Sequence, residues 1–309
     1  MQGMQVDVND AEFRRFIAHL RERRIPAKYL YAGSAAALHA RFAIEYSEEY
    51  VDGRVDHEIA TLLAAQGAAG PPRQICDIGP SNGAHTLQFL RRYGEMGGQV
   101  TRYLGLDFSE PLLRVARRRL EYVLPAEHAF GQWDAELLPS ERIESWRTDD
   151  VVLICFLGNT LGNVDDPVGV LRNLRSSVRE GDRLLLGVYA TPVAESAGDA
   201  MRTYTHPAVR QMIKEPLTWV GVTDELFDLS VVHEPGAIHA RIRLRESIVV
   251  KGIRFEAGEE IHCFTSRRFD AGLVADLLRR SGWELERWTR EGAIDHLVSL
   301  ARAVGSGRA

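Results

Sequence analysis

The sequence predicts an α/β protein built on a doubly wound, mostly parallel sheet, and three observations lead to this fold class. From Arg73 onward, short and almost continuously apolar segments alternate with amphipathic helical patterns. That alternation is typical of parallel strands with helices on both faces. The first apolar segment runs directly into a turn that holds Gly79, Pro80 and Gly83. The chain has 309 residues, of which 45% are hydrophobic, so it can bury a large core.

The first 70 residues are predicted to be a helical segment that acts as a lid. Apolar residues recur at helical spacing from about Asp10 to Arg24, and Pro26 ends that pattern. A second helix is expected to start near Ser34, and a third covers "DHEIATLL", residues 56–63, before a run of glycines and prolines.

Residues 71–191 and 270–309 are expected to form the domain that carries the main sheet. Ser109 is the predicted N-cap of its second crossover helix, and Gly181 and Asp182 form the turn into a fifth strand. After a closing helix, the last segments are expected to form a hairpin of this sheet. The first strands and helices are expected, in chain order, in QICDIG, HTLQFLRRYG, YLGLDF, EPLLRVARRRLEYVL, VVLICFLG, PVGVLRNLRSSV and RLLLGVYA.

Residues 192–269 interrupt the alternation and are predicted to be an inserted α+β substrate lobe. A helical stretch near Ser196 to Lys214 comes first. Two long segments of alternating polar and apolar residues follow, "AIHARIRLRESIVV" and "GIRFEAGEEIHCFTSRRF". Such alternation predicts an antiparallel sheet with one solvated face.

The composition favours a cytoplasmic protein that acts on a small molecule. The formal net charge is −5 and the pI is about 6.1, so no electrostatic footprint for nucleic acid or an acidic membrane is expected. No apolar run is of signal-peptide type or long enough to span a membrane. The three cysteines lie far apart, which predicts buried thiols and no metal site. Monomer and homodimer both stay open.

The turn after the first strand, "CDIGPSNGAHTLQFL", is predicted to bind a cofactor. In doubly wound sheets, ligands bind outside the carboxyl ends of the strands. The dinucleotide fingerprint is not met, because Ser81 stands where its second glycine belongs. S-adenosylmethionine has no phosphate, and Asp77, Gly79 and Gly83 match the acid and looser glycine turn of the enzymes that use it.

Two further acids follow the next strands and support the same cofactor. Asp107 ends "YLGLDF", where a carboxylate can accept hydrogen bonds from both ribose hydroxyls. Asp134, in "GQWDAELLP", either accepts from an adenine amino group or caps a helix. Together with the glycine turn, these positions favour S-adenosylmethionine as the cofactor.

The segment "ICFLGNTLGNVDDP", together with "DIGPSNG" and "FEAGEEIHCFTSRRF", resembles the histidine-specific Nα-methyltransferases of the ergothioneine pathway. In that family a strand ends in phenylalanine and a G-[ST]-T-[IL]-G-N loop, matched here by Phe156 through Asn163. The resemblance implies the Rossmann-like fold of class I methyltransferases, with Phe156 and Gly158 next to the cofactor. It also implies that Asn163 bonds the amino-acid part of the substrate, and that Tyr204 grips the substrate carboxylate.

One departure from the family pattern bears on the substrate. Where the histidine enzymes have a glutamate and a serine that recognise the imidazole, this chain has Phe264 and keeps Ser266. A site that loses its polar acceptor loses discrimination of roughly 10⁴-fold, so histidine is not the expected substrate. Phe264 suits a flat apolar side chain such as an indole, or fills the space left by a smaller substrate. Tyr29 and Tyr31 are expected either to form part of the lid or to pack in the core.

The leading functional hypothesis is methyl transfer from S-adenosylmethionine to the amine of an amino acid or related small amine, with Asn163 and Tyr204 positioning the reactants. An alternative uses S-adenosylmethionine alone: its amine attacks its γ-carbon, giving azetidine-2-carboxylate and methylthioadenosine, or the aminocarboxypropyl group is transferred to an acceptor. A third possibility is a non-catalytic binding protein. His206 is a candidate proton acceptor, and His85 is expected to face solvent from the first helical turn after Gly83.

Overall fold

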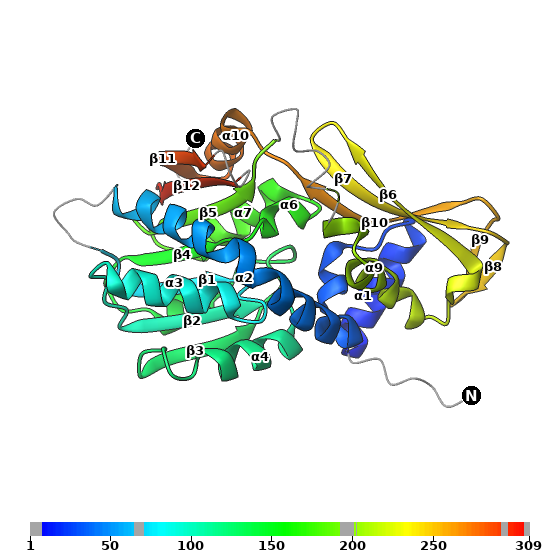
Figure 1. The fold of residues 1–309 in the computed structure, drawn as a ribbon, viewed down its shortest axis with the longest axis horizontal. Helices are drawn as coiled ribbons and strands as arrows, with labels where there is room; N and C mark the ends of the chain where they lie inside the picture. Colours follow the sequence, from blue (N-terminus) through cyan, green and yellow to red (C-terminus); the bar gives the residue numbers. More distant parts are fainter. Residues whose placement is uncertain (1–7, 65–70, 192–200, 202, 292–295, 306–309) are drawn as a thin grey trace. The chain divides into compact units, whose positions relative to one another are not determined.

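The structure, a computed structural model, describes residues 8–64, 71–191, 201, 203–291 and 296–305, without the side chains of 43–52 and 291. The chain divides into two compact units. Unit 1 comprises Met1–Phe42 and Pro192–Arg267, and unit 2 comprises Ala43–Thr191 and Arg268–Ala309. Each unit is described by itself below, with the element labels of Figure 1.

Unit 2 is built on a seven-stranded sheet with the order β11-β12-β5-β4-β1-β2-β3. The first five strands along the chain are mutually parallel, whereas β12 runs antiparallel to β5 and to β11. The predicted α/β fold class and its closing hairpin are therefore confirmed (Figure 1). The strands are β1 (Gln74–Ile78), β2 (Arg102–Asp107), β3 (Glu127–Gln132), β4 (Val152–Phe156), β5 (Arg183–Tyr189), β11 (Trp283–Glu291) and β12 (His296–Ala303).

Helices cover both faces of this sheet. One face packs against α2 (Gly33–Leu63), α3 (Ala84–Glu95) and α4 (Glu110–Leu120). The other packs against α5 (Arg142–Trp146), α6 (Thr160–Asn163), α7 (Pro167–Ser176) and α10 (Ala271–Arg280). Because both faces are covered, successive residues of β5 such as Leu184, Leu185 and Leu186 are all buried, which explains the continuous apolar runs of the sequence.

Side-chain caps mark the starts of α4, α7 and α10 in unit 2. The hydroxyl of Ser109 accepts a hydrogen bond from the backbone N–H of Leu112 at 3.3 Å, as predicted for the N-cap of α4. Asp166 and Asp270 cap α7 and α10 in the same way. These caps satisfy backbone donors that have no partner within the helix.

One expectation for the N-terminal segment is wrong. The helices expected near Ser34 and over "DHEIATLL" are a single helix, α2, of 31 residues. No proline lies between its ends, and Gly53 costs only about 1 kcal/mol relative to alanine, so nothing in the sequence forces a break. The boundary between the two units falls within this helix.

Unit 1 contains a three-stranded antiparallel sheet, β10-β7-β6, and a two-stranded hairpin of β8 and β9. The two alternating segments are strands as predicted, but each is split, and β6 was not predicted. The strands are β6 (Phe227–Glu234), β7 (Ala237–Leu244), β8 (Ile248–Val250), β9 (Ile253–Phe255) and β10 (Glu260–Arg267). Lys251 and Gly252, both with positive φ, form the turn between β8 and β9.

Short helices also belong to the described part of unit 1. They include α1 (Asp10–Arg21), η1 (Ala27–Tyr31), α9 (Pro207–Thr218) and η2 (Asp224–Leu226). The helical stretch expected from Ser196 begins within 192–200, which lie outside the described residues. Within that stretch, α9 starts at Pro207, whose fixed φ suits the first helical position, and extends to Thr218.

Other expectations from composition can be compared directly with the structure. None of the helices in the described ranges is long and apolar enough to cross a membrane. Within the same ranges, no group of three or more histidine, cysteine, aspartate or glutamate side chains is placed to hold a metal ion. Cys76, Cys155 and Cys263 are free and buried, as predicted.

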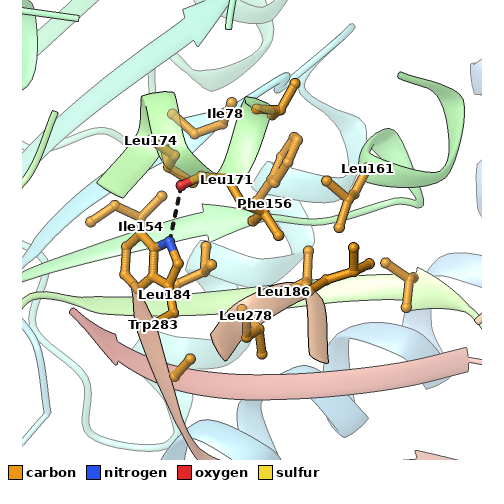
Figure 2. Close-up of a cluster of buried hydrophobic side chains, with 14 of the residues drawn as sticks. Ile78, Ile154, Phe156, Leu161, Leu171, Leu174, Leu184, Leu186, Leu278 and Trp283 are labelled. Atoms are coloured by element: carbon orange, nitrogen blue, oxygen red, sulfur yellow. Dashed lines mark hydrogen bonds between the residues drawn. The ribbon is translucent and has the colours of Figure 1, made fainter. Parts of the chain in front are cut away.

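The larger core cluster of unit 2 lies between the sheet and the helices α7 and α10 (Figure 2). Trp283 belongs to this cluster, and its indole N–H donates to the backbone carbonyl of Leu171 at 3.1 Å. Leu171 itself is fully buried. The cluster therefore combines close packing with a satisfied indole donor.

Truncating Leu171 tests how far this cluster stabilises unit 2. Leu171→Ala removes a fully buried side chain, so the free energy of unfolding in urea should fall by about 2–5 kcal/mol. Leu137→Ala, at a half-exposed leucine, is the control and should change it by less than about 1 kcal/mol. Equal losses for the two variants would contradict this description of the core.

Candidate active site

The turn between β1 and α3 has a left-handed backbone at three positions, Gly79, Ser81 and Gly83, with φ of 73°, 54° and 76°. The N–H of Gly79 donates to the carbonyl of Leu106 at 2.7 Å, which ties the turn to β2. A Cβ on Gly83 would lie 3.0 Å from the Cα of Ala116, so a glycine there lets α3 pack tightly against α4. Ser81 adopts a conformation that non-glycine residues rarely take.

Asp107 explains how Ser81 is held. One carboxylate oxygen accepts the N–H of Ser81 at 3.1 Å, and the other accepts the N–H of Ser109 at 2.8 Å. Burial raises the pKa of Asp107 to about 6, although the two N–H bonds oppose that shift. Each oxygen has a second lone pair, so the carboxylate can still accept bonds from a ligand.

Asp77 has a different position. Its side chain is 7% exposed and accepts hydrogen bonds from the hydroxyls of Thr86 at 2.6 Å and Tyr103 at 3.1 Å. Burial raises its pKa, and both hydroxyls oppose the shift. Through these two hydrogen bonds, Asp77 joins the end of β1 to α3 and to β2.

Asp134 closes a turn after β3. Its carboxylate accepts the N–H of Glu136 at 3.0 Å, and its carbonyl accepts the N–H of Leu137 at 3.1 Å. The next helix in the described chain, α5, begins at Arg142, so Asp134 is the cap of a turn and not of a helix. The expected contact with adenine stays a prediction.

The loop after β4 is anchored on β5. Gly158 and Asn159 both have positive φ, 71° and 65°. The side chain of Asn159 accepts the N–H of Tyr189 at 2.9 Å, and its own N–H donates to the carbonyl of Gly187 at 3.3 Å. Asn163 lies at the end of the one-turn helix α6 and is partly buried. The anchoring role of Asn159 was not predicted; its signal in the sequence was a Gly-Asn pair, which favours left-handed backbone.

Phe156 belongs to the core and is 1% exposed (Figure 2). Its ring packs in the cluster that contains Leu161 and Leu171. Any contact of Phe156 with the cofactor would therefore involve its backbone. By contrast, a Cβ built on Gly158 meets nothing within 4 Å, so the backbone there has open space beside it.

In unit 1 the structure brings together three of the predicted substrate residues. The hydroxyl of Tyr204 donates to the hydroxyl of Ser266 at 2.7 Å, and the rings of Tyr204 and Phe264 lie 5.4 Å apart. All three side chains are buried. The late strand β10 thus presents Ser266 and Phe264 to one tyrosine.

The N-terminal tyrosines do not form one group. Tyr29 is fully buried, donates to a carboxylate oxygen of Glu12 at 2.9 Å and packs edge-on against Phe16 and Trp219. That environment matches the core-packing alternative. Tyr31 instead lies edge-on to His39, with ring centroids 4.7 Å apart.

The two candidate histidines have definite partners. The imidazole of His206 accepts the N–H of Ala208 at 3.2 Å and so caps α9. His85 was expected to face solvent, but its Nε2 lies 2.9 Å from a carboxylate oxygen of Glu58, which is 0% exposed. Burial lowers the pKa of His85, yet the charges of Glu58 and Asp77 outweigh it and raise the pKa overall. Sequence periodicity gave no signal for this pair, because its partners come from α2 and α3.

The carboxyl edge of the unit 2 sheet fits S-adenosylmethionine. Its turn has Ser81 where a pyrophosphate would need bare backbone, open space at Gly158, and a half-buried carboxylate, Asp107, at the end of β2. A mostly parallel seven-stranded sheet with a final antiparallel hairpin, combined with this edge, defines a class I S-adenosylmethionine-dependent methyltransferase.

The model of the histidine-specific, S-adenosylmethionine-dependent methyltransferase family matches residues 13–209, more than half of the chain. The chain belongs to this family, and its cofactor is S-adenosylmethionine. No curated protein sequence matches the chain.

Solved structures similar to the chain are distant. A S-adenosylmethionine-dependent methyltransferase from Clostridium acetobutylicum is 12% identical, with a TM-score of 0.49 over 86% of this chain and 98% of that one. The 1,6-didemethyltoxoflavin-N1-methyltransferase from Burkholderia thailandensis is 15% identical, with a TM-score of 0.49 over 97% of this chain and 94% of that one. The amino pentose methyltransferase CalS10 from Micromonospora echinaspora is 13% identical, with a TM-score of 0.45 over 85% and 95%.

Replacing Glu58 tests the ion pair at the start of α3. Glu58→Gln removes the charge 2.9 Å from His85, so the pKa of His85 should fall, as measured by NMR titration of its imidazole Cε1–H signal. Glu58→Gln should also lower the free energy of unfolding at low pH, where His85 is protonated. Only the imidazolium attracts Glu58, and that contribution is lost as the pH rises through the raised pKa of His85.

Asp56→Asn is the matched control, because Asp56 lies on the same helix but is exposed and pairs with Arg92. It should leave the His85 titration unchanged, and a His85→Gln variant identifies the signal. An unchanged titration in Glu58→Gln would mean that the two side chains do not interact as described.

Proposed function

We propose that this protein transfers the methyl group of S-adenosylmethionine to the amine of an amino acid or related small amine other than histidine. The observation that carries the proposal is the buried group of Tyr204, Ser266 and Phe264. The Tyr204 hydroxyl donates a hydrogen bond of 2.7 Å to the Ser266 hydroxyl, and the third member of the group, Phe264, is an apolar ring.

The chemistry of this group argues against an imidazole. A buried imidazole N–H needs an acceptor, and a phenyl ring at 264 supplies none. A polar group that is left without a partner in a buried site costs about 1–3 kcal/mol. An apolar or small side chain on the acceptor avoids that cost, which is why we expect an amino acid other than histidine.

Each part of the chain has a role in this proposal. The domain of residues 71–191 and 270–309 would bind the cofactor, with Asp107 accepting the ribose hydroxyls and Asp134 the adenine amino group. The lobe of residues 192–269 would bind the acceptor. Residues 1–70 would serve as a lid. The cofactor supplies an activated methyl group, so the protein's main tasks are to align the amine and exclude water.

The family resemblance supplies the proposed substrate contacts. Asn163 would hydrogen-bond the amino-acid part of the acceptor, and the Tyr204 hydroxyl would bind its carboxylate. The backbone of Gly79, Ser81 and Gly158 would leave room for the methionyl part of the cofactor.

Nucleoside products distinguish this proposal from its rivals. We expect S-adenosylhomocysteine only when an amine from a panel of amino acids is added, and none with histidine as the sole acceptor. Tyr204→Phe should raise the KM for the acceptor about tenfold, because it removes one hydrogen bond to a charged group. Tyr122→Phe, at an exposed tyrosine, should leave it unchanged.

Two outcomes would contradict the proposal. Methylthioadenosine formed without any acceptor would mean attack on the γ-carbon of S-adenosylmethionine. Efficient methylation of histidine would mean that Phe264 does not exclude it.

A further inference from the structure

Tyr189 is a titratable residue at the cofactor edge for which the reaction described so far has no use. It is the last residue of β5, the strand beside β4, and is half-buried. Its backbone is fixed twice: its N–H donates to the side chain of Asn159 at 2.9 Å, and its carbonyl accepts the N–H of Phe269 at 2.9 Å. Carboxyl ends of parallel strands are where ligands bind in such sheets.

Two guanidinium groups lie against this phenol. The Arg54 guanidinium carbon is 4.9 Å from the ring centroid, and Arg54 donates to the phenolic oxygen at 3.3 Å. The Arg268 guanidinium carbon is 4.5 Å from the same centroid, and Arg268 is buried. The charge of Arg54 lowers the pKa of Tyr189; burial opposes it and Arg268 adds to it. Both cations stabilise a phenolate over a phenol.

Other polar neighbours in the described part of unit 2 do not cancel this effect. His296 pairs with Tyr189 across the strands β12 and β5. Its Nε2 would lie 2.9 Å from a Cβ on Gly187, so the ring occupies space that only glycine leaves. Burial lowers the pKa of His296 well below its ordinary value, so the ring is neutral. Glu58 is 3.9 Å from this imidazole and pairs with His85.

We propose that Tyr189 is the catalytic base that deprotonates the acceptor. This inference rests on the proposed function, since methylation of an amine first requires a neutral nitrogen. The Tyr189 phenolate takes one proton from the substrate ammonium and becomes a phenol. The freed nitrogen lone pair forms a bond to the methyl carbon, the methyl–sulfur bond breaks and its electron pair stays on sulfur. The phenol then returns its proton to solvent.

A base is most effective when its pKa lies near the working pH. An unperturbed phenol ionises at a pH of about 10, too high for this task. The two arginines move it in the needed direction without a metal or a histidine.

The first test combines kinetics with direct titration of the phenol. Tyr189→Phe should lower kcat/KM for the amine about 10²-fold and abolish its rise with pH. The affinity for S-adenosylhomocysteine, measured by calorimetry, should not change. The ultraviolet difference spectrum between wild type and Tyr189→Phe should show one tyrosine that ionises below the ordinary range. Arg54→Met should move both this titration and the rise of kcat/KM to higher pH.

Tyr122→Phe is the matched control and should leave kinetics and pH profile as in wild type, because Tyr122 is 91% exposed. The proposal is overturned if Tyr189→Phe keeps kcat/KM within about twofold and retains the pH profile, or if the titration of Tyr189 is not lowered. Failure of the proposed function would look different: no amine would yield S-adenosylhomocysteine with the wild-type protein, while the titration would still report on Tyr189.

Discussion

The hydrogen bonds of Asp107 are the interaction on which the carboxyl edge of the unit 2 sheet depends. Its two carboxylate oxygens hold the N–H groups of Ser81, in the turn after β1, and Ser109, at the start of α4. One side chain thereby fixes two loops and keeps Ser81 in a left-handed conformation that would otherwise be strained. Burial raises the pKa of Asp107 to about 6, so at neutral pH the carboxylate is ionised and can bind hydroxyl donors.

The sequence predicted the parts of the fold that local patterns determine. Apolar strands alternating with amphipathic helices indicated the parallel sheet, and Ser109 indicated the start of α4. The patterns failed where a boundary depends on tertiary contacts. Nothing local separates one long helix α2 from two shorter ones, and β6 was missed because most of its residues are partly exposed and its burial comes from pairing with β7.

The candidate site shows the same division. Spacing in the sequence predicted roles for the glycine turn and Asp107, and the family resemblance predicted roles for Tyr204 and Ser266, which the structure joins by a hydrogen bond. Neither spacing nor the resemblance indicated the pair of Glu58 and His85, because an ion pair between two helices leaves no periodic signal in the sequence. The buried Glu58 and the half-buried His85 lie on the side of the sheet that α2 and α3 cover, so polar contacts in unit 2 also occur between its helices.

The most direct test of the account is calorimetric titration of S-adenosylhomocysteine into wild-type protein and Asp107→Asn at a series of pH values. The account predicts that wild-type affinity falls as the pH drops through about 6, where Asp107 takes up a proton, and that the variant binds at least tenfold more weakly with that pH dependence lost. Equal affinity for both proteins across the series would contradict it.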